Sequence, residues 1–144
     1  MESREGQRIE ISFLAGILTK SEKEATMRVN YYSPVFLIER IGEKMHQERI
    51  KGKIILTSSV LAGKHTPFLE DYCLSKGLLE KYAQEKTEYW KLKRIEIRVV
   101  LPNLTRTPMI EEQINMYEEE VRQGRRQKID SPENIAEEIA GLCV

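Results

Sequence analysis

Three short apolar runs, separated by long connections, constrain the fold of this chain more than any other feature. Each run is rich in Ile, Leu and Val and lacks strict alternation throughout, which is typical of buried parallel strands. The runs read IEISFLA at 9–15, GKIILTS at 52–58 and IEIRVVL at 95–101. Helical segments at 21–45 and 70–90 lie between them, and each connection is long enough for a crossover helix. The sequence therefore predicts two consecutive βαβ units.

The rest of the chain adds helices and no further strand. A helix is expected near 110–123, and another from Pro132, which takes the first helical position behind Ser131 as the N-cap. We see no interdomain linker, repeat or low-complexity segment. We predict one α/β domain over residues 1–144, with a partial parallel sheet between two helical layers.

Composition narrows the classes of function. The 144 residues carry 23 Lys plus Arg and 23 Asp plus Glu, so no net charge draws the chain to nucleic acid or an anionic membrane. No apolar run reaches membrane-span length and Met1–Arg8 is too polar for a secretory signal, so we expect a cytoplasmic protein. Cys73 and Cys143 fit no metal or redox spacing, and no metal site is predicted.

Three turns are expected at one edge of the predicted sheet, because each follows the C-terminal end of a strand. They are Ala15-Gly16, Ser58-Ser59 and Pro102-Asn103. Ligands of open α/β sheets bind at that edge. The helix that contains Tyr72 and Lys76 starts there too, so the serine pair, the tyrosine and the lysine are predicted to converge.

Tyr72 and Lys76 have a spacing that suits proton transfer. A tyrosine transfers protons near neutral pH only if its pKa falls well below about 10. Lys76, at i+4 on the same helix face, can supply a positive charge that favours the phenolate. Ser59 could hydrogen-bond a substrate oxygen meanwhile. Taken alone, such a pair is more often a packed tyrosine beside a solvated lysine.

Asn30 and Pro34 form a second constraint in the first helix. Proline has no N–H, so the Asn30 carbonyl loses its intrahelical partner and must find a water molecule or a side chain. That carbonyl could hold a water molecule that reaches Lys76. A simple proline kink is the alternative.

The segments RVNYYSPVFL, GKIILTSSVLAG, YCLSK and LPNLTRTPM occur in the order found in short-chain dehydrogenases/reductases. The chain resembles that family from about Ile9 to Leu142, with intervals of 29 residues from Asn30 to Ser59, 13 to Tyr72 and 4 to Lys76. The resemblance implies a Rossmann-like fold and an oxidoreductase that uses NAD or NADP on a carbonyl/alcohol pair.

The resemblance also implies roles for individual residues. Tyr72 would be the acid/base, Ser59 would orient the substrate, Lys76 would bind the nicotinamide ribose and lower the tyrosine pKa, and the Asn30 carbonyl would hold the relay water. Residues expected to contact the cofactor, besides Tyr72 and Lys76, are Ala15, Gly16, Pro102, Asn103, Leu104 and Thr107.

The chain also departs from the family. No two of its eight glycines lie closer than ten residues, so no glycine-rich phosphate loop can be written. Phe13 and Leu14 replace two asparagines of the family, and Asn103 replaces a glycine, where φ > 0 would then fall on a non-glycine residue. The chain looks like the catalytic, second half of the doubly wound domain, so weak cofactor binding is expected.

Two functions from different classes remain open. One is the NAD(P)-dependent oxidoreductase, with a small carbonyl or alcohol as substrate. The other is a non-catalytic remnant that acts as an interaction subunit after losing dinucleotide binding; the chain could also be a fragment of a longer protein. In either case we expect a homo-oligomer, formed through the helices at 21–45 and 70–90 or through an open strand edge at 9–15.

Overall fold

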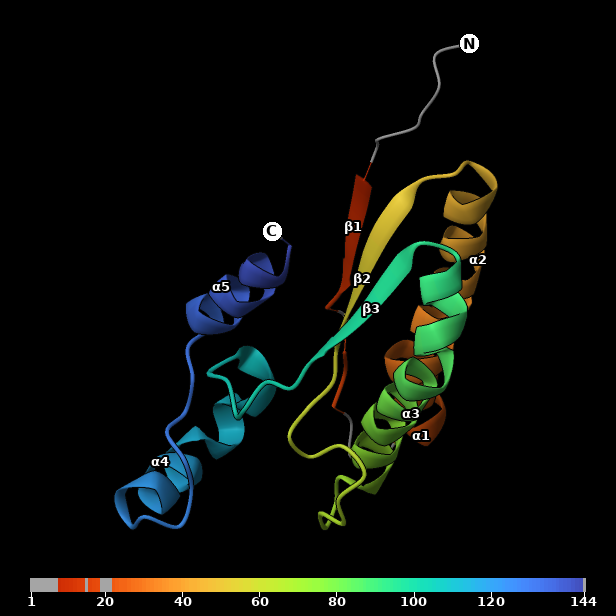
Figure 1. Cartoon of the computed structure of the whole chain (residues 1–144). Helices are drawn as coiled ribbons and strands as arrows, with labels where there is room; N and C mark the ends of the chain where they lie inside the picture. Colours follow the sequence, from red (N-terminus) through yellow and green to blue (C-terminus); the bar gives the residue numbers. More distant parts are fainter. Residues whose placement is uncertain (1–7, 15, 19–21, 144) are drawn as a thin grey trace.

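The computed structural model describes residues 8–14, 16–18 and 22–143. Their strands are β1 (Arg8–Phe13), β2 (Lys51–Thr57) and β3 (Ile95–Val100), all parallel and in the order β1-β2-β3. Figure 1 shows the three strands running in one direction, with helices between them. The two predicted βαβ units and the α/β class are confirmed.

The helices follow the predicted order. They are α1 (Lys23–Met27), the π-helical η1 (Arg28–Tyr32), α2 (Ser33–Gln47), α3 (Glu70–Leu92), the 3-10 helix η2 (Pro108–Gln113), α4 (Ile114–Arg122) and α5 (Pro132–Leu142). Helix α5 begins as predicted, because the Ser131 hydroxyl accepts a hydrogen bond of 3.2 Å from the Asn134 N–H. The expected helix near 110–123 is divided between η2 and α4.

The π-turn η1 lies where Pro34 interrupts the helical hydrogen bonds. Pro34 cannot donate to the Asn30 carbonyl, and just before it the Ser33 N–H bonds the Arg28 carbonyl, five residues back. The helix therefore continues from α1 into α2 through one widened turn. Asn30 lies within this turn, buried against the neighbouring structure.

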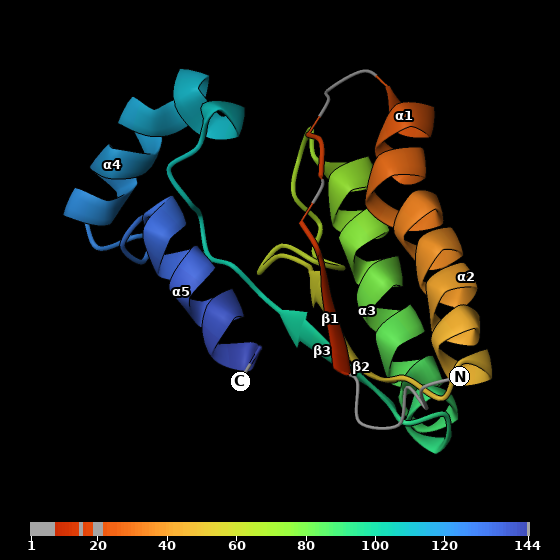
Figure 2. The same cartoon turned by 90° about the horizontal axis from the view of Figure 1, so that it is seen from above.

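One face of the sheet packs against α2 and α3. Ile54 and Leu56 of β2 are fully buried there with Ile38 of α2 and with Leu79 and Trp90 of α3. In Figure 2, α1, α2 and α3 lie on one side of the strands, and α4 and α5 lie on the other. The alternating side chains of each strand therefore face two different layers.

The opposite face carries a smaller core beneath α5. Ile55 of β2 and Val100 of β3 are buried with Ile139 of α5. Beside them Lys53 is 6% exposed, and its ammonium group donates to the Leu142 carbonyl at the C-terminal end of α5. A cation at a helix C-terminus stabilises the helix dipole, so Lys53 helps to attach α5 to the sheet.

The outer edge of β1 has no strand beside it among the described residues, since β1 pairs only with β2. Ile9 and Leu14 on this strand and just after it are 38% and 58% exposed. Its outward N–H and C=O groups are open to pairing. This agrees with the predicted edge at 9–15, of which Ala15 lies outside the described residues.

Packing between α2 and α3 depends on a glycine. A Cβ on Gly42 would lie 2.5 Å from the ring of Trp90, which is fully buried. We predict that Gly42→Ala lowers the free energy of unfolding by about 1–3 kcal/mol, because the ring cannot move away without disturbing the core.

Chemical unfolding of a matched control tests this. A Cβ on Gly141 of α5 would meet nothing within 4 Å, so Gly141→Ala should leave stability unchanged or raise it by up to about 1 kcal/mol. Equal stability of the two variants would contradict the proposed close approach of α2 to Trp90.

Candidate active site

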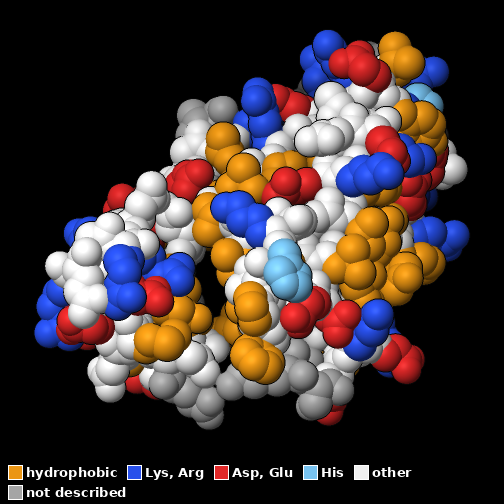
Figure 3. Space-filling model, turned by 90° about the horizontal axis from the view of Figure 1, so that it is seen from below, with side chains coloured by type: hydrophobic (Ala, Val, Ile, Leu, Met, Phe, Trp, Pro, Cys, Tyr) orange, Lys and Arg blue, Asp and Glu red, His pale blue; other side chains and the backbone are white. Residues whose placement is uncertain are grey.

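The predicted site residues lie at the edge of the sheet where the strands end. Viewed from that side, the surface opens between the part that contains η2 and α4 and the part that contains α1–α3 (Figure 3). Hydrophobic side chains lie on the rim of this opening. A ligand entering here would meet the chain immediately after β2 and β3.

Asn30 binds the backbone that follows β1. Its Oδ1 accepts a hydrogen bond of 2.8 Å from the Ile17 N–H, and its Nδ2 donates to the Ile17 carbonyl at 2.9 Å. The same Nδ2 lies 3.1 Å from the Ser75 hydroxyl, which in turn donates to the Tyr72 carbonyl at 2.8 Å. The Asn30 side chain thus joins the π-turn, the segment after β1 and helix α3.

Lys76 projects from α3 to the end of β2. Its side chain is buried, and Nζ donates a hydrogen bond of 2.8 Å to the Thr57 carbonyl. A Cβ on Gly16 would lie 3.3 Å from this Nζ and 3.6 Å from Asn30 Oδ1, so glycine lets the backbone approach both groups. Burial lowers the pKa of Lys76 to about 8, because water no longer solvates the charge.

Tyr72 and Ser59 face one another across the turn after β2. The Ser59 side chain lies near enough to the Tyr72 phenol to affect its pKa, and the Ser59 Oγ accepts a hydrogen bond of 3.2 Å from the Leu61 N–H. Burial raises the pKa of Tyr72, and the nearby Ser59 side chain partly offsets this. This upward shift of the Tyr72 pKa is opposite to the lowering that the sequence predicted. Lys76 does not lower it here, because its Nζ bonds the Thr57 carbonyl and lies 5.9 Å from the Tyr72 ring centroid.

The segment after β3 lies beside the turn after β2. The Val60 N–H donates to the Pro102 carbonyl at 3.2 Å, and the Leu104 carbonyl accepts from the Asp130 N–H at 2.9 Å. Thr107 is the N-cap of η2, with an extended backbone. Gly16 and Pro102 therefore lie at the edge with Ser59, whereas Ala15 falls outside the described residues.

The expectation of a strained Asn103 is wrong. Asn103 is not among the non-glycine residues with positive φ, which are Arg49, Phe68 and Arg94. Its carbonyl accepts a hydrogen bond of 2.9 Å from the Thr105 hydroxyl. Asparagine can replace glycine here because the backbone at this position does not use the left-handed region.

Three contacts of the site were not recognised in the sequence. Ser75 links Asn30 to α3, the Thr57 carbonyl receives Lys76, and the Ser58 hydroxyl donates to Glu80 at 2.6 Å. Ser75 and Ser58 each adjoin a residue of the predicted set, which was the available signal. The Thr57 carbonyl is a backbone group and leaves no mark in a side-chain pattern.

Among the residues that the structure describes, no group of His, Cys, Asp or Glu side chains is arranged to hold a metal ion. Within the same part of the chain, no helix has the length and apolar character needed to cross a membrane.

The burial of Lys76 predicts a pH dependence of stability. Its pKa is about 8 when folded and 10.5 in the ordinary state, so burying the charged form opposes folding below pH 8. This penalty is relieved as pH rises above 8. The free energy of unfolding should therefore gain a positive contribution between pH 8 and 10, with a slope of at most about 1.4 kcal/mol per pH unit. Above pH 10 the raised pKa of Tyr72 acts in the opposite direction.

Denaturant titrations at several pH values can isolate this contribution. Lys76→Met should abolish the slope, while Lys81→Met, which removes an exposed lysine from the same helix, should retain it. The same slope in both variants would show that Lys76 is not the buried group that titrates.

Comparisons with known proteins address the family and the fold of the chain. A family model described as short chain dehydrogenase matches residues 10–118. A search of curated proteins finds no significant match. Among solved structures, 4-hydroxyisoleucine dehydrogenase complexed with NADH is 20% identical, with a TM-score of 0.83, over 94% of this chain and 60% of the other.

Two further solved structures are similar. A 3-oxoacyl-[acyl-carrier protein] reductase from Brucella melitensis in complex with NAD is 23% identical, with a TM-score of 0.82, over 93% of this chain and 59% of the other. A gluconate 5-dehydrogenase from Burkholderia cenocepacia J2315 in complex with NADP and tartrate is 23% identical, with a TM-score of 0.68, over 79% and 48%. This chain thus spans about 60% or less of these structures, and it belongs to the short-chain dehydrogenase family.

Proposed function

We propose that this chain carries the catalytic residues of an NAD(P)-dependent oxidoreductase that interconverts a carbonyl group and an alcohol. The observation that carries the proposal is the nearness of the Ser59 side chain to the Tyr72 phenol, beside the buried Lys76. Such a pair can hold a substrate oxygen between a hydroxyl that orients it and a phenol that exchanges a proton with it.

The residues present fit the nicotinamide and ribose end of the cofactor. Gly16 has no side chain where its backbone approaches Lys76, and a Cβ there would narrow the approach to Nζ. The Lys76 ammonium group would bind the ribose hydroxyls, while Gly16, Pro102, Asn103, Leu104 and Thr107 would contact the nicotinamide end. When bound, the nicotinamide supplies the hydride chemistry of the reaction.

Proton transfer at Tyr72 would require its pKa to fall from the raised value of this structure. The Lys76 ammonium group supplies the necessary charge if it moves from the Thr57 carbonyl toward the phenol, since a nearby cation favours the phenolate. Asn30 is a positioning residue: its side chain fixes Ile17 and Ser75, and its carbonyl is proposed to hold a water molecule near Lys76.

Dinucleotide affinity is proposed to be weak. Pyrophosphate is normally bound at a helix N-terminus over a tight glycine turn, and the sequence contains no such loop. About 40% of each of these similar solved structures lies outside the aligned part, so a cofactor half from elsewhere would complete the site.

A non-catalytic interaction subunit is the second candidate. It is favoured by the open edge of β1 and by the exposed Phe36 and Leu37 on α2, which are 63% and 43% exposed. In this case the polar cluster around Asn30 and Lys76 would only tie the helices to the sheet. We propose a cytoplasmic location for either function.

Cofactor titration and turnover separate these candidates. We predict that NADH and NADPH bind with a dissociation constant above about 10 μM, weaker than about −7 kcal/mol. Where reduction of a carbonyl substrate panel is measurable, Tyr72→Phe should lower kcat by about 10²-fold or more, because the proton donor is lost.

Tyr89→Phe is the matched control, since Tyr89 lies near the other end of α3. It should retain full turnover. The absence of any binding and turnover in the isolated chain and after addition of a cofactor half would favour the interaction subunit.

Self-association is a separate prediction of the proposal. Light scattering should show a species larger than a monomer, because the β1 edge and the exposed side chains of α2 are both available for contact. Phe36→Glu should dissociate a dimer formed through the helices, and slow hydrogen exchange at 9–13 should mark a dimer formed through the edge. A monomer with fast exchange along β1 would contradict both.

A further inference from the structure

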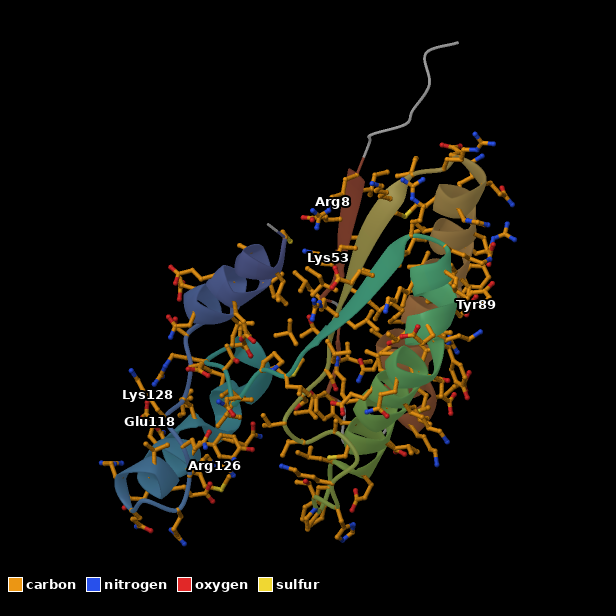
Figure 4. The ribbon with its side chains drawn as sticks, viewed as in Figure 1. Arg8, Lys53, Tyr89, Glu118, Arg126 and Lys128 are labelled. Carbon is orange, nitrogen blue, oxygen red and sulfur yellow. The ribbon has the colours of Figure 1, made fainter. Side chains whose placement is uncertain are left out.

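A second cavity lies at the opposite end of the sheet from the candidate active site. It has a volume of about 590 Å³ and is lined by the starts of the strands, by the outer side of β3 and by the C-terminal part of α3. Figure 4 shows Arg8 at the end where β1 begins. Strand β2 has seven residues, so about 20 Å separates this end from Ser58.

Positive charge is concentrated around this cavity. Its lining contains five cations, Arg8, Lys51, Lys91, Arg94 and Arg98, but only two carboxylates, Glu88 and Glu96. The whole chain has a formal net charge of zero, so the excess is local. Lining of one sign raises the local concentration of the opposite ion.

The acids near the cavity are already paired. Glu96 lies 2.5 Å from Arg98, Glu88 lies 3.8 Å from Lys91, and Glu10 lies 2.8 Å from Arg8. Among the residues that the structure describes, Lys51 and Arg94 make no ion pair. These two cations therefore remain available to a ligand.

The strand register places like charges side by side. Arg8 pairs directly with Lys51, and Arg94 immediately precedes Ile95, the partner of Gly52. Like charges on opposite positions of neighbouring strands destabilise a sheet. Two residues further along, Glu10, Lys53 and Glu96 alternate in sign. Glu10 balances Arg8, so Lys51 and Arg94 are the cations of this row that an anion would neutralise.

Backbone conformation adds a second unfavourable feature at the same place. Arg94 has φ = 66° in the turn between α3 and β3, and its carbonyl accepts a hydrogen bond of 3.1 Å from the Gly52 N–H. Glycine is the usual residue in a left-handed turn after a helix, and a long side chain there costs free energy. Arg49 occupies the matching turn before β2, with φ = 58°.

The dipole of helix α3 explains only some of the cations that line the cavity. Lys91 and Arg94 lie at the C-terminal end of α3, where any cation is favourable. Arg8, Lys51 and Arg98 belong to strands, whose net dipoles are small. The helix dipole therefore does not explain why these three cations line the cavity.

We propose that this cavity binds a small polyanion that carries phosphate groups. Guanidinium groups bind phosphate oxygens through two parallel N–H bonds, and a lysine adds a point charge. The cavity volume lies within the range of sites for small molecules. The site is independent of the proposed NAD(P) site, which lies at the other end of the strands.

Calorimetry with tripolyphosphate on the whole chain tests the proposal, at about 0.15 M ionic strength, which limits diffuse binding. We expect saturable binding with one site per chain. The double variant Lys51→Gln/Arg94→Gln should bind about tenfold more weakly or worse, which corresponds to about 1.4 kcal/mol. Tripolyphosphate should raise the Tm of the wild type but not that of the variant.

The matched control is Arg125→Gln/Lys128→Gln, which removes two cations from an exposed loop. It should retain wild-type affinity. Equal weakening in both variants, or no binding by the wild type, would overturn the proposal. Amide chemical shifts should move at 51–53 and 91–98; shifts confined to 57–63 and 72–76 would place the anion in the cofactor site and would also overturn it. Binding of an acidic peptide but not of tripolyphosphate would assign the surface to a protein partner instead.

Discussion

The hydrogen bond from the buried Lys76 ammonium group to the Thr57 carbonyl is the contact on which the carboxyl edge of the sheet depends. It joins the start of α3 to the last residue of β2, and the Lys76 side chain is buried there. A buried charge is costly unless it is bonded, so this single acceptor determines where the side chain lies. The lowered pKa of Lys76 is the direct result of that burial.

Asn30 extends the same arrangement to the first half of the chain. Its amide satisfies both backbone groups of Ile17, which would otherwise be left unpaired after β1 ends. The π-turn brings this side chain to Ser75, and Gly16 gives the backbone room beside Lys76. Three segments distant in sequence are therefore fixed by a few buried polar contacts, a type of network that specifies one geometry when every member is satisfied.

The two ends of the sheet are built on different physical principles. At the carboxyl edge, polar groups are buried and pair with one another, as around Asn30 and Lys76. At the amino edge, cations lie exposed in neighbouring strands, and Arg8 and Lys51 repel one another. The first arrangement pairs its polar groups within the protein, whereas the second leaves Lys51 and Arg94 without an ion pair among the described residues.

Much of the fold was predictable because it depends on local pattern. Three apolar runs and two long connections determined a parallel sheet, and Ser131 with Pro132 located the start of α5. The spacing of Asn30, Ser59, Tyr72 and Lys76 predicted their common location, since residues at strand ends and at the start of a helix meet at one edge.

Other features were decided only by the tertiary structure. The upward shift of the Tyr72 pKa follows from burial. It also reflects the position of Lys76 Nζ, which is bonded to a backbone carbonyl. The absence of a positive φ at Asn103 depends on how the chain leaves β3. The row of cations exists only because the register sets Arg8 opposite Lys51, and Gly52 opposite Ile95, the residue that follows Arg94. Sequence determined which groups are present and roughly which elements they occupy; packing determined which of them lose water and which face one another, because both depend on contacts between distant segments.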